Sequence, residues 1–148
     1  MSKVSWQKFI ASARVVDVKI GGIMGILAEM RVDEAPLPNA WAIDVSHAYK
    51  VKGTELWARV VADAEGPGGG LLVDAVGIFR FGMKLKSVPD EYIQRFYAAT
   101  AIPAVAPTTR ATFNDTNVRM GLGAPHIGFL VMSDGELRVA EVPDDHSV

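Results

Sequence analysis

The 148-residue sequence predicts a single α+β domain in which strands occupy the first half and helices follow. Two stretches carry this prediction. Residues 41–52 alternate between apolar and polar side chains with a period of two, which is typical of a strand with one covered face. Residues 87–97 begin with helix-start residues and continue with aromatic side chains at helical spacing. At this length a chain buries about 68–70% of its unfolded surface, so one core suffices.

The segment before residue 41 predicts extended structure that glycines interrupt. Residues 10–20 alternate imperfectly, and an apolar stretch over residues 23–30 follows the pair Gly21-Gly22. Glycines inside a strand pattern commonly mark a bulge or a bend. We therefore expect one long interrupted strand or two short strands, followed by a proline-containing loop over residues 35–39.

Two more strands are predicted after residues 41–52, over residues 55–65 and 71–81. The glycine-rich stretch at 66–70 separates them, and it lacks the lysine and hydroxyl residue of a phosphate-binding loop, so we interpret it as a hairpin turn. The last of these strands is apolar on both faces. Because helices on one side of a small sheet cover only one face, the other face of this strand is expected to meet a neighbouring subunit.

Helices are predicted after residue 86. Ser87 is the expected capping residue of the first helix, with Pro89 in its first turn, and Pro107 is expected to open a second helix that runs to Met120 and stops at Gly121. Residues 127–132 and 137–142 are predicted to be extended. The predicted domain therefore covers residues 1–142, and residues 143–148 are predicted to form a flexible C-terminal tail.

Composition argues against several classes of partner. The formal net charge is −2 and the predicted pI is near 5.9, so we expect neither a nucleic acid nor a membrane surface as a partner. No apolar run approaches the roughly 20 residues of a spanning helix. The chain has no cysteine and no recognisable signal peptide, which predicts a cytoplasmic protein without disulfides or thiolate zinc sites.

Catalytic and metal-binding patterns are also missing from the sequence. The three histidines, His47, His126 and His146, have no regular metal-ligand spacing, and His47 is most simply a packed or interface residue. No nucleophile elbow is present. We therefore predict no catalytic residues, no metal and no cofactor, and a protein that is not an enzyme.

The central third of the chain carries a set of short motifs in a fixed order. They are the strand end Gly77-Ile78-Phe79, the proline-rich turn Ile102–Pro107 followed by Arg110, and the exit from Gly121 to Pro125-His126-Ile127. In this order the chain resembles the SecB family of export chaperones, whose members carry a Gly-Ile-Phe strand end, a Phe-Pro-Tyr-Ala-Arg helix opening and a Gly-x-x-Pro-x-Leu exit. Pro107 and Arg110 keep the spacing of the helix opening, and the exit is one residue longer here. The resemblance spans about residues 10–130.

The resemblance implies a four-stranded antiparallel sheet backed by two helices, assembled as a dimer of dimers. Family members hold unfolded client polypeptides in long apolar grooves without ATP. Leu71, Val73 and Ala75 form an apolar row on the fourth strand, where the family's dimers stack, so we predict them at the oligomer interface. The predicted groove consists of apolar and aromatic side chains, for each of which core packing is the rival interpretation: Trp41, Phe79, Phe81, Tyr92, Phe96, Ile127 and Phe129.

One departure from the family shapes the functional prediction. Typical members present acidic residues on the outer sheet surface to bind the SecA motor, whereas this chain has Lys19, Gly21-Gly22 and Leu72 in the corresponding region. SecA binding is therefore doubtful, and we predict a holdase outside general export with a dedicated client, for which antitoxin-protecting family members are a precedent. The alternative is an adaptor that binds one folded partner on the same scaffold; an enzyme is a third possibility.

Overall fold

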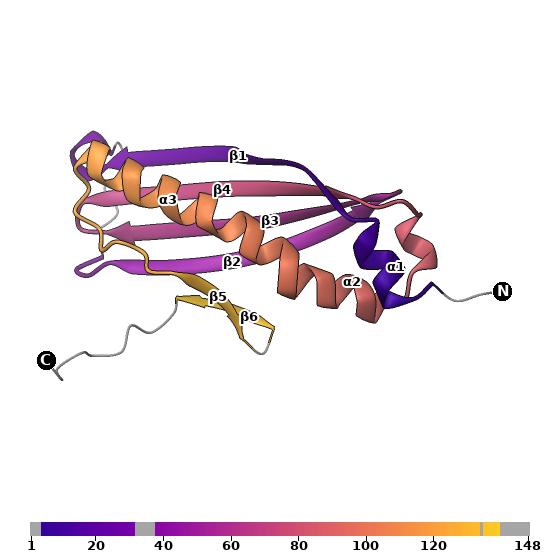
Figure 1. Cartoon of the computed structure of the whole chain (residues 1–148). Helices are drawn as coiled ribbons and strands as arrows, with labels where there is room; N and C mark the ends of the chain where they lie inside the picture. The colour runs from indigo at the N-terminus through magenta and orange to yellow at the C-terminus, as the bar shows by residue number, and fades with distance from the viewer. Residues whose placement is uncertain (1–3, 32–37, 134, 140–148) are drawn as a thin grey trace, which may run out of the picture.

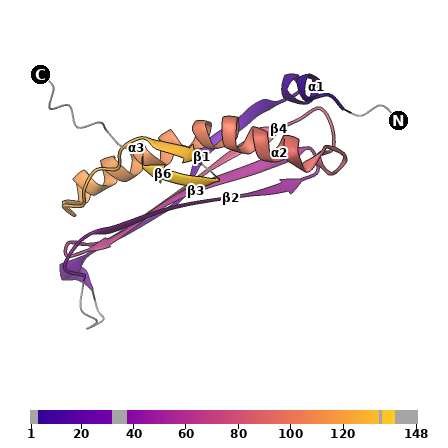
Figure 2. The same cartoon turned by 90° about the horizontal axis from the view of Figure 1, so that it is seen from below.

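A computed structural model describes residues 4–31, 38–133 and 135–139. It contains a four-stranded antiparallel sheet in the order β1-β4-β3-β2 (Figure 1). Helices and a short hairpin cover one face of this sheet, and its other face is left open (Figure 2). The predicted α+β fold with a four-stranded antiparallel sheet is confirmed. The sheet strands are β1 (Arg14–Leu27), β2 (Ala42–Lys52), β3 (Glu55–Gly66) and β4 (Gly69–Arg80), and the covering elements are α1 (Trp6–Ala11), α2 (Asp90–Phe96), α3 (Ile102–Met120) and the hairpin of β5 (Leu130–Ser133) and β6 (Glu136–Val139).

Strand β1 is one long edge strand with two irregularities. Its register against β4 shifts between Val15 and Asp17 and again between Ile20 and Gly22. The second shift coincides with the glycine pair, which confirms the interrupted strand expected from the sequence. Helix α1, which precedes β1, was not predicted. It has only six residues, so no apolar periodicity could identify it, although the Ser5 hydroxyl caps it by accepting a hydrogen bond from the Lys8 amide at 3.2 Å.

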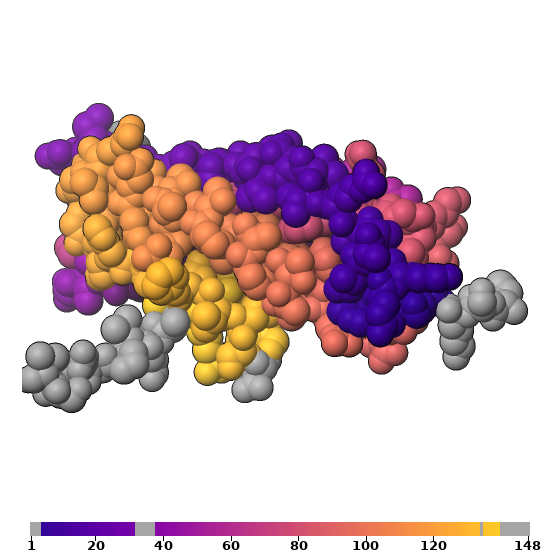
Figure 3. Space-filling model, viewed as in Figure 1, coloured from indigo at the N-terminus to yellow at the C-terminus, as the bar shows by residue number. Residues whose placement is uncertain are grey.

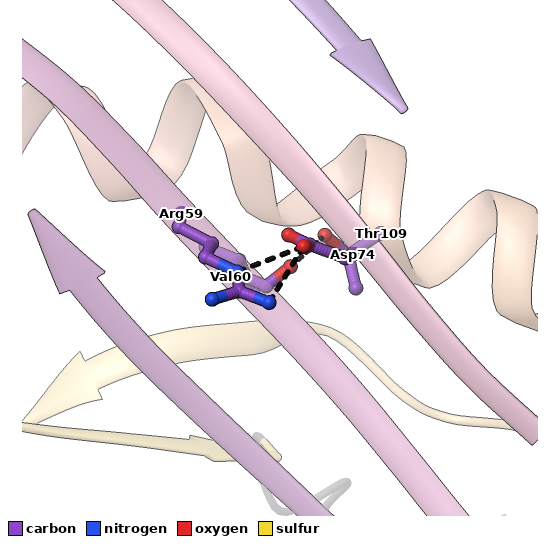
Figure 4. Close-up of polar contacts among 4 residues, drawn as sticks. All are labelled: Arg59, Val60, Asp74 and Thr109. Carbon is purple, nitrogen blue, oxygen red and sulfur yellow. Dashed lines mark hydrogen bonds and ion pairs between the residues drawn. The ribbon is translucent and has the colours of Figure 1, made fainter. Parts of the chain in front are cut away.

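Small residues on the covered face of the sheet allow α3 to lie close to it. The inward row of β3 contains three alanines between residues 56 and 64, all buried. On β4, a Cβ built on Gly77 would lie 2.4 Å from the Val105 Cγ2 atom, so α3 contacts the strand backbone at this point. Thr109 of α3, which is fully buried, donates a hydrogen bond to the Val60 carbonyl at 3.0 Å, which connects the helix to β3 (Figure 4).

The two predicted helix starts were wrong. The Ser87 hydroxyl bonds the Lys84 carbonyl in a 3₁₀ turn, η2 (Leu85–Ser87), and α2 begins at Asp90. Helix α3 begins at Ile102, and Pro107 lies inside it. Proline is tolerated at the first turn of a helix, where Pro103 lies. A π-helical segment, η3 (Tyr97–Ala101), connects α2 to this turn directly.

Tertiary packing explains why the helix continues through Pro107. Its neighbours Val105, Ala106 and Thr109 are buried against the sheet, while the Pro107 ring is exposed. The burial of these neighbours offsets the hydrogen bond that proline cannot make, and local propensity cannot reveal this. The predicted stop was correct, because Gly121 follows the helix with a left-handed φ of 66°.

The row predicted at the oligomer interface faces inward, which corrects that prediction. Leu71, Val73 and Ala75 are at most 1% exposed, and they pack on the covered side of β4. Side chains sealed inside one protomer cannot contact another. The alternate residues of β4, including Leu72 and Val76, face the open side instead. The predicted tail and the end of the predicted final strand, residues 140–148, lie outside the described residues.

Candidate functional site

The structure places the seven predicted groove residues in different environments. Phe79, Phe81, Phe96 and Ile127 are at most 3% exposed and belong to the core. Trp41 and Tyr92 are partly buried, and Phe129 is 68% exposed. The contacts that each of these residues makes explain why their exposed fractions differ.

Four of the seven meet in one aromatic cluster beneath α1. The Phe9 ring stacks on Phe81 with a centroid distance of 4.6 Å and an interplanar angle of 1°. Phe96 meets both Phe79 and Phe81 edge to face, and Tyr92 lies near Phe9 at a centroid distance of 6.0 Å. These geometries are the favourable ones for aromatic pairs in a core. The cluster therefore holds α1 against the end of the sheet, and its rings are covered by Phe9.

Trp41 and Ile127 belong to a second apolar cluster, under the C-terminal half of α3. The Trp41 ring lies against Gly66, where a Cβ would come within 2.3 Å of it. This contact explains why position 66 has no room for a side chain. Residues 66–70 form the β3–β4 hairpin turn predicted from the sequence. Phe129 lies apart from both clusters, with the Arg110 guanidinium 4.5 Å from its ring centroid.

Side chains of α3 hold residues 121–127, which we call the exit segment and which lead to Phe129. Asn117 accepts a hydrogen bond from the Ala124 amide at 3.1 Å and donates one to the Ala124 carbonyl at 2.7 Å. Asn114 makes the same pair of bonds with Ile127, whose carbonyl also accepts from Arg110. The segment is thus held extended along the helix (Figure 3), and the β5–β6 hairpin that follows lies beside β2 (Figure 1).

A partly exposed row on β2 forms an accessible surface on the covered side of the sheet, as Val15 and Ile23 do on the opposite edge strand β1. We call it the β2 surface and define it as Val45, His47, Tyr49 and Val51. Tyr49 is 39% exposed and Val51 is 40% exposed, whereas the equivalent row of β3 is sealed. Among the described residues, no strand pairs with the outer edge of β2. A cleft between β2 and β6 continues this surface, lined by Asp44, Val45, Ser46, His47, Glu136 and Leu137.

Tyr97 is a buried residue that contacts two residues of the β2 surface, His47 and Tyr49. Its hydroxyl lies 2.5 Å from the His47 Nδ1 atom, and its ring centroid lies 4.5 Å from that of Tyr49. Burial raises the pKa of the Tyr97 hydroxyl above its ordinary value, and the neighbouring Tyr49 raises it further. Tyr97 therefore stays neutral, and its hydroxyl shares a hydrogen bond with the His47 ring whose direction depends on the tautomer of His47. The strict alternation of β2 could place His47, Tyr49 and Val51 on one face, but sequence alone could not show that this face stays accessible.

The chemistry available at this surface is apolar contact and backbone pairing. Within residues 4–31, 38–133 and 135–139, no group of three or more histidine, aspartate or glutamate side chains could hold a metal ion. None of the helices in the described part of the chain is long and apolar enough to cross a membrane. An edge strand beside aromatic and aliphatic side chains can accept an extended polypeptide, since backbone bonding requires no particular sequence.

Comparison with solved structures shows a SecB-like fold. The chain is similar to the SecB-like chaperone Rv1957 of Mycobacterium tuberculosis, solved in complex with a ChAD peptide from the HigA1 antitoxin Rv1956. The TM-score is 0.60 at 14% sequence identity, and the match covers 84% of this chain and 90% of the chaperone chain. No model of a known protein family matches the sequence, and no curated protein matches it.

Proposed function

We propose that this protein is an ATP-independent holdase chaperone that binds unfolded or aggregation-prone polypeptides on the β2 surface. The observation that carries the proposal is the accessible pair Tyr49 and Val51 on the edge strand β2, whose outer edge pairs with no strand among the described residues. A non-native chain exposes apolar side chains and unpaired backbone groups. Many weak contacts of both kinds along one client add up to strong binding.

The client is proposed to be dedicated, of the antitoxin type. Two features support this. The similar Mycobacterium tuberculosis chaperone was solved with a peptide from an antitoxin. Lys19 and Leu72, which replace the acids expected for SecA binding, lie on the open face of the sheet. We accordingly expect SecA to bind this protein far more weakly than it binds a general export chaperone, and a comparable affinity in a titration would contradict a role outside export.

Neighbouring residues of β2 supply a matched test of the binding surface. Val51→Asp places a charge on the β2 surface, and Ala48→Asp places the same charge on the opposite face of the same strand. Both positions are exposed, so neither change should unfold the protein. The measurement is light scattering of a denatured, unrelated client diluted into each variant at stoichiometric ratios.

The wild type and Ala48→Asp should suppress aggregation, and Val51→Asp should require several-fold more protein for the same effect. Equal suppression by both variants would contradict the assignment of the β2 surface. Failure of the wild type to suppress aggregation of any client would instead favour an adaptor that binds one folded partner.

A further inference from the structure

A shallow pocket, which we call the open-face pocket, lies on the side of the sheet that the helices leave open. Three strands supply its described lining residues: Ala48, Tyr49, Lys50, Trp57, Arg59 and Val76. Strand pairing places Ala48 directly opposite Arg59 and Lys50 directly opposite Trp57. The short side chain at position 48 therefore leaves a hollow among longer ones. Its volume is about 300 Å³, at the lower end of the range for ligand sites.

The pocket presents two cations, and none of its described lining residues is acidic. The Lys50 ammonium lies 5.1 Å from the centroid of the Trp57 ring. Arg59 bonds one oxygen of the Asp74 carboxylate through Nε at 2.8 Å and through a terminal nitrogen at 2.7 Å (Figure 4). This ion pair holds the guanidinium in place, and the Arg59 side chain is still 54% exposed. Its second terminal nitrogen makes no hydrogen bond within the described part of the chain, so it can bind an acceptor from outside.

Trp57 adds two further features to the pocket. Its indole N–H is buried and has no acceptor among the described residues, which favours a ligand that brings hydrogen-bond acceptors, because buried donors in proteins are nearly always paired. Its ring offers apolar surface to methylene groups. A carboxylate on a short aliphatic stem matches this combination, since arginine binds carboxylates with two parallel hydrogen bonds and lysine adds a point charge. Aspartate and glutamate side chains have this chemistry.

The pocket lies in a region of the open face where basic side chains outnumber acidic ones. Strand pairing assigns six basic and two acidic residues to this region, a formal charge of +4: Arg14, Lys19, Lys50, Lys52, Arg59 and Arg80, with Asp17 and Glu55. Arg80 is paired with Glu55 inside the region, and Arg59 is paired with Asp74 outside it. Removing both pairs from the count leaves +3. One small anion would contact few of these charges, whereas a ligand with several carboxylates would contact most of them.

The extent of the basic region limits the class of ligand. Along β3 it runs from Glu55 to Arg59, a distance of about 14 Å. Beyond it the open face is acidic, with Asp44, Asp63 and Asp74. A nucleic acid or an anionic membrane carries negative charge over a longer distance and would meet these carboxylates. An acidic polypeptide segment can be short enough to avoid them.

We propose that the open-face pocket and the basic side chains around it bind an acidic segment of a partner polypeptide. One aspartate or glutamate side chain of the segment enters the pocket, where its carboxylate bonds Arg59 and contacts the Lys50 ammonium. Its methylene groups pack on the Trp57 ring. Neighbouring carboxylates of the segment contact Lys19 and Lys52, which are exposed on the same face. This site is separate from the β2 surface and adds a second binding activity to the proposed function.

The variants Ala48→Asp and Val51→Asp distinguish this site from the β2 surface. The aspartate introduced at position 48 lies directly opposite Arg59 and supplies the pocket with a carboxylate of its own. Val51→Asp makes the same change in net charge on the covered side of the strand. The probe is a short fluorescein-labelled peptide in which glutamates alternate with serines, so that its carboxylates share one side of an extended chain. Fluorescence anisotropy measures binding, and circular dichroism checks that both variants are folded.

The wild type and Val51→Asp should bind the glutamate peptide with affinities within about twofold of each other, and Ala48→Asp should bind it about tenfold more weakly. The same peptide with glutamine in place of glutamate should not bind. No binding by the wild type, an equal loss in both variants, or equally tight binding of a single-stranded oligonucleotide of the same charge would overturn the proposal. Suppression of client aggregation should show the reverse pattern, impaired in Val51→Asp and kept in Ala48→Asp, so the two proposals fail separately.

Discussion

Replacing Asn117 by aspartate tests how the exit segment is held, and its effect should depend on pH. Asn117 is 3% exposed and makes two hydrogen bonds with Ala124. The substitution removes the donor to the Ala124 carbonyl, and an unsatisfied buried acceptor costs about 1–3 kcal/mol. Burying a carboxylate there costs more, so we expect a loss of about 3 kcal/mol in the free energy of unfolding at neutral pH.

The sign of the pH dependence follows from which state binds the proton. Burial raises the pKa of the introduced carboxyl in the folded state above its unfolded value, so the folded state holds the proton longer. A protonated carboxyl can also donate to the Ala124 carbonyl. The loss should therefore shrink to about 1 kcal/mol below pH 4 and grow as the pH rises through the range just above it.

Urea unfolding of wild type and variant between pH 3.5 and 7.5 measures this difference. Asn114→Asp serves as a control, because Asn114 is only partly buried and its partner Ile127 is also bonded by Arg110. Its loss should be smaller and less dependent on pH, since the nearby guanidinium compensates an introduced charge. A difference between wild type and Asn117→Asp that stays constant over the whole range would refute the reasoning.

Three further substitutions test the packing of the sheet. Gly77→Ala should lower the free energy of unfolding by about 1–3 kcal/mol because α3 leaves no room for a methyl group there, whereas Gly22→Ala, with nothing within 4 Å of the added carbon, should have little effect in the same denaturation assay. Thr109→Val keeps the side-chain shape but loses a buried hydrogen bond, and calorimetry should show a loss of about 1 kcal/mol. Phe9→Ala removes the ring stacked on Phe81 and should cost about 3–5 kcal/mol; a loss below 1 kcal/mol would mean that α1 is not part of the core.

The sheet was predictable because its signals are local. The period-two alternation over residues 41–52 located β2, the glycine-rich stretch at 66–70 located the β3–β4 hairpin, and the pair Gly21-Gly22 located the irregularity in β1. The helix starts were predicted less well. Pro107 opens helices in many sequences, but here the buried residues on either side of it extend α3 back to Ile102.

The candidate site was predicted only in part, because exposure depends on the whole fold. Phe79, Phe81 and Phe96 were predicted to line the groove but are buried in the core, because helix α1, which covers them, leaves no signal long enough to detect. The row of Leu71, Val73 and Ala75 could not be assigned to the covered or the open face of a strand that is apolar on both. Tyr49 and Val51 share a parity with partly buried residues of the same strand, and only the structure shows that they are more accessible than these.

Site-specific photo-crosslinking tests the central claim most directly. A photoreactive amino acid at position 49 reports on the β2 surface, and the same group at position 48 reports on the opposite face of the strand. With a denatured client present, position 49 should form a covalent adduct with the client, and position 48 should form little or none. Adducts of equal yield at both positions, or at position 48 alone, would contradict the proposal that unfolded polypeptides bind beside β2.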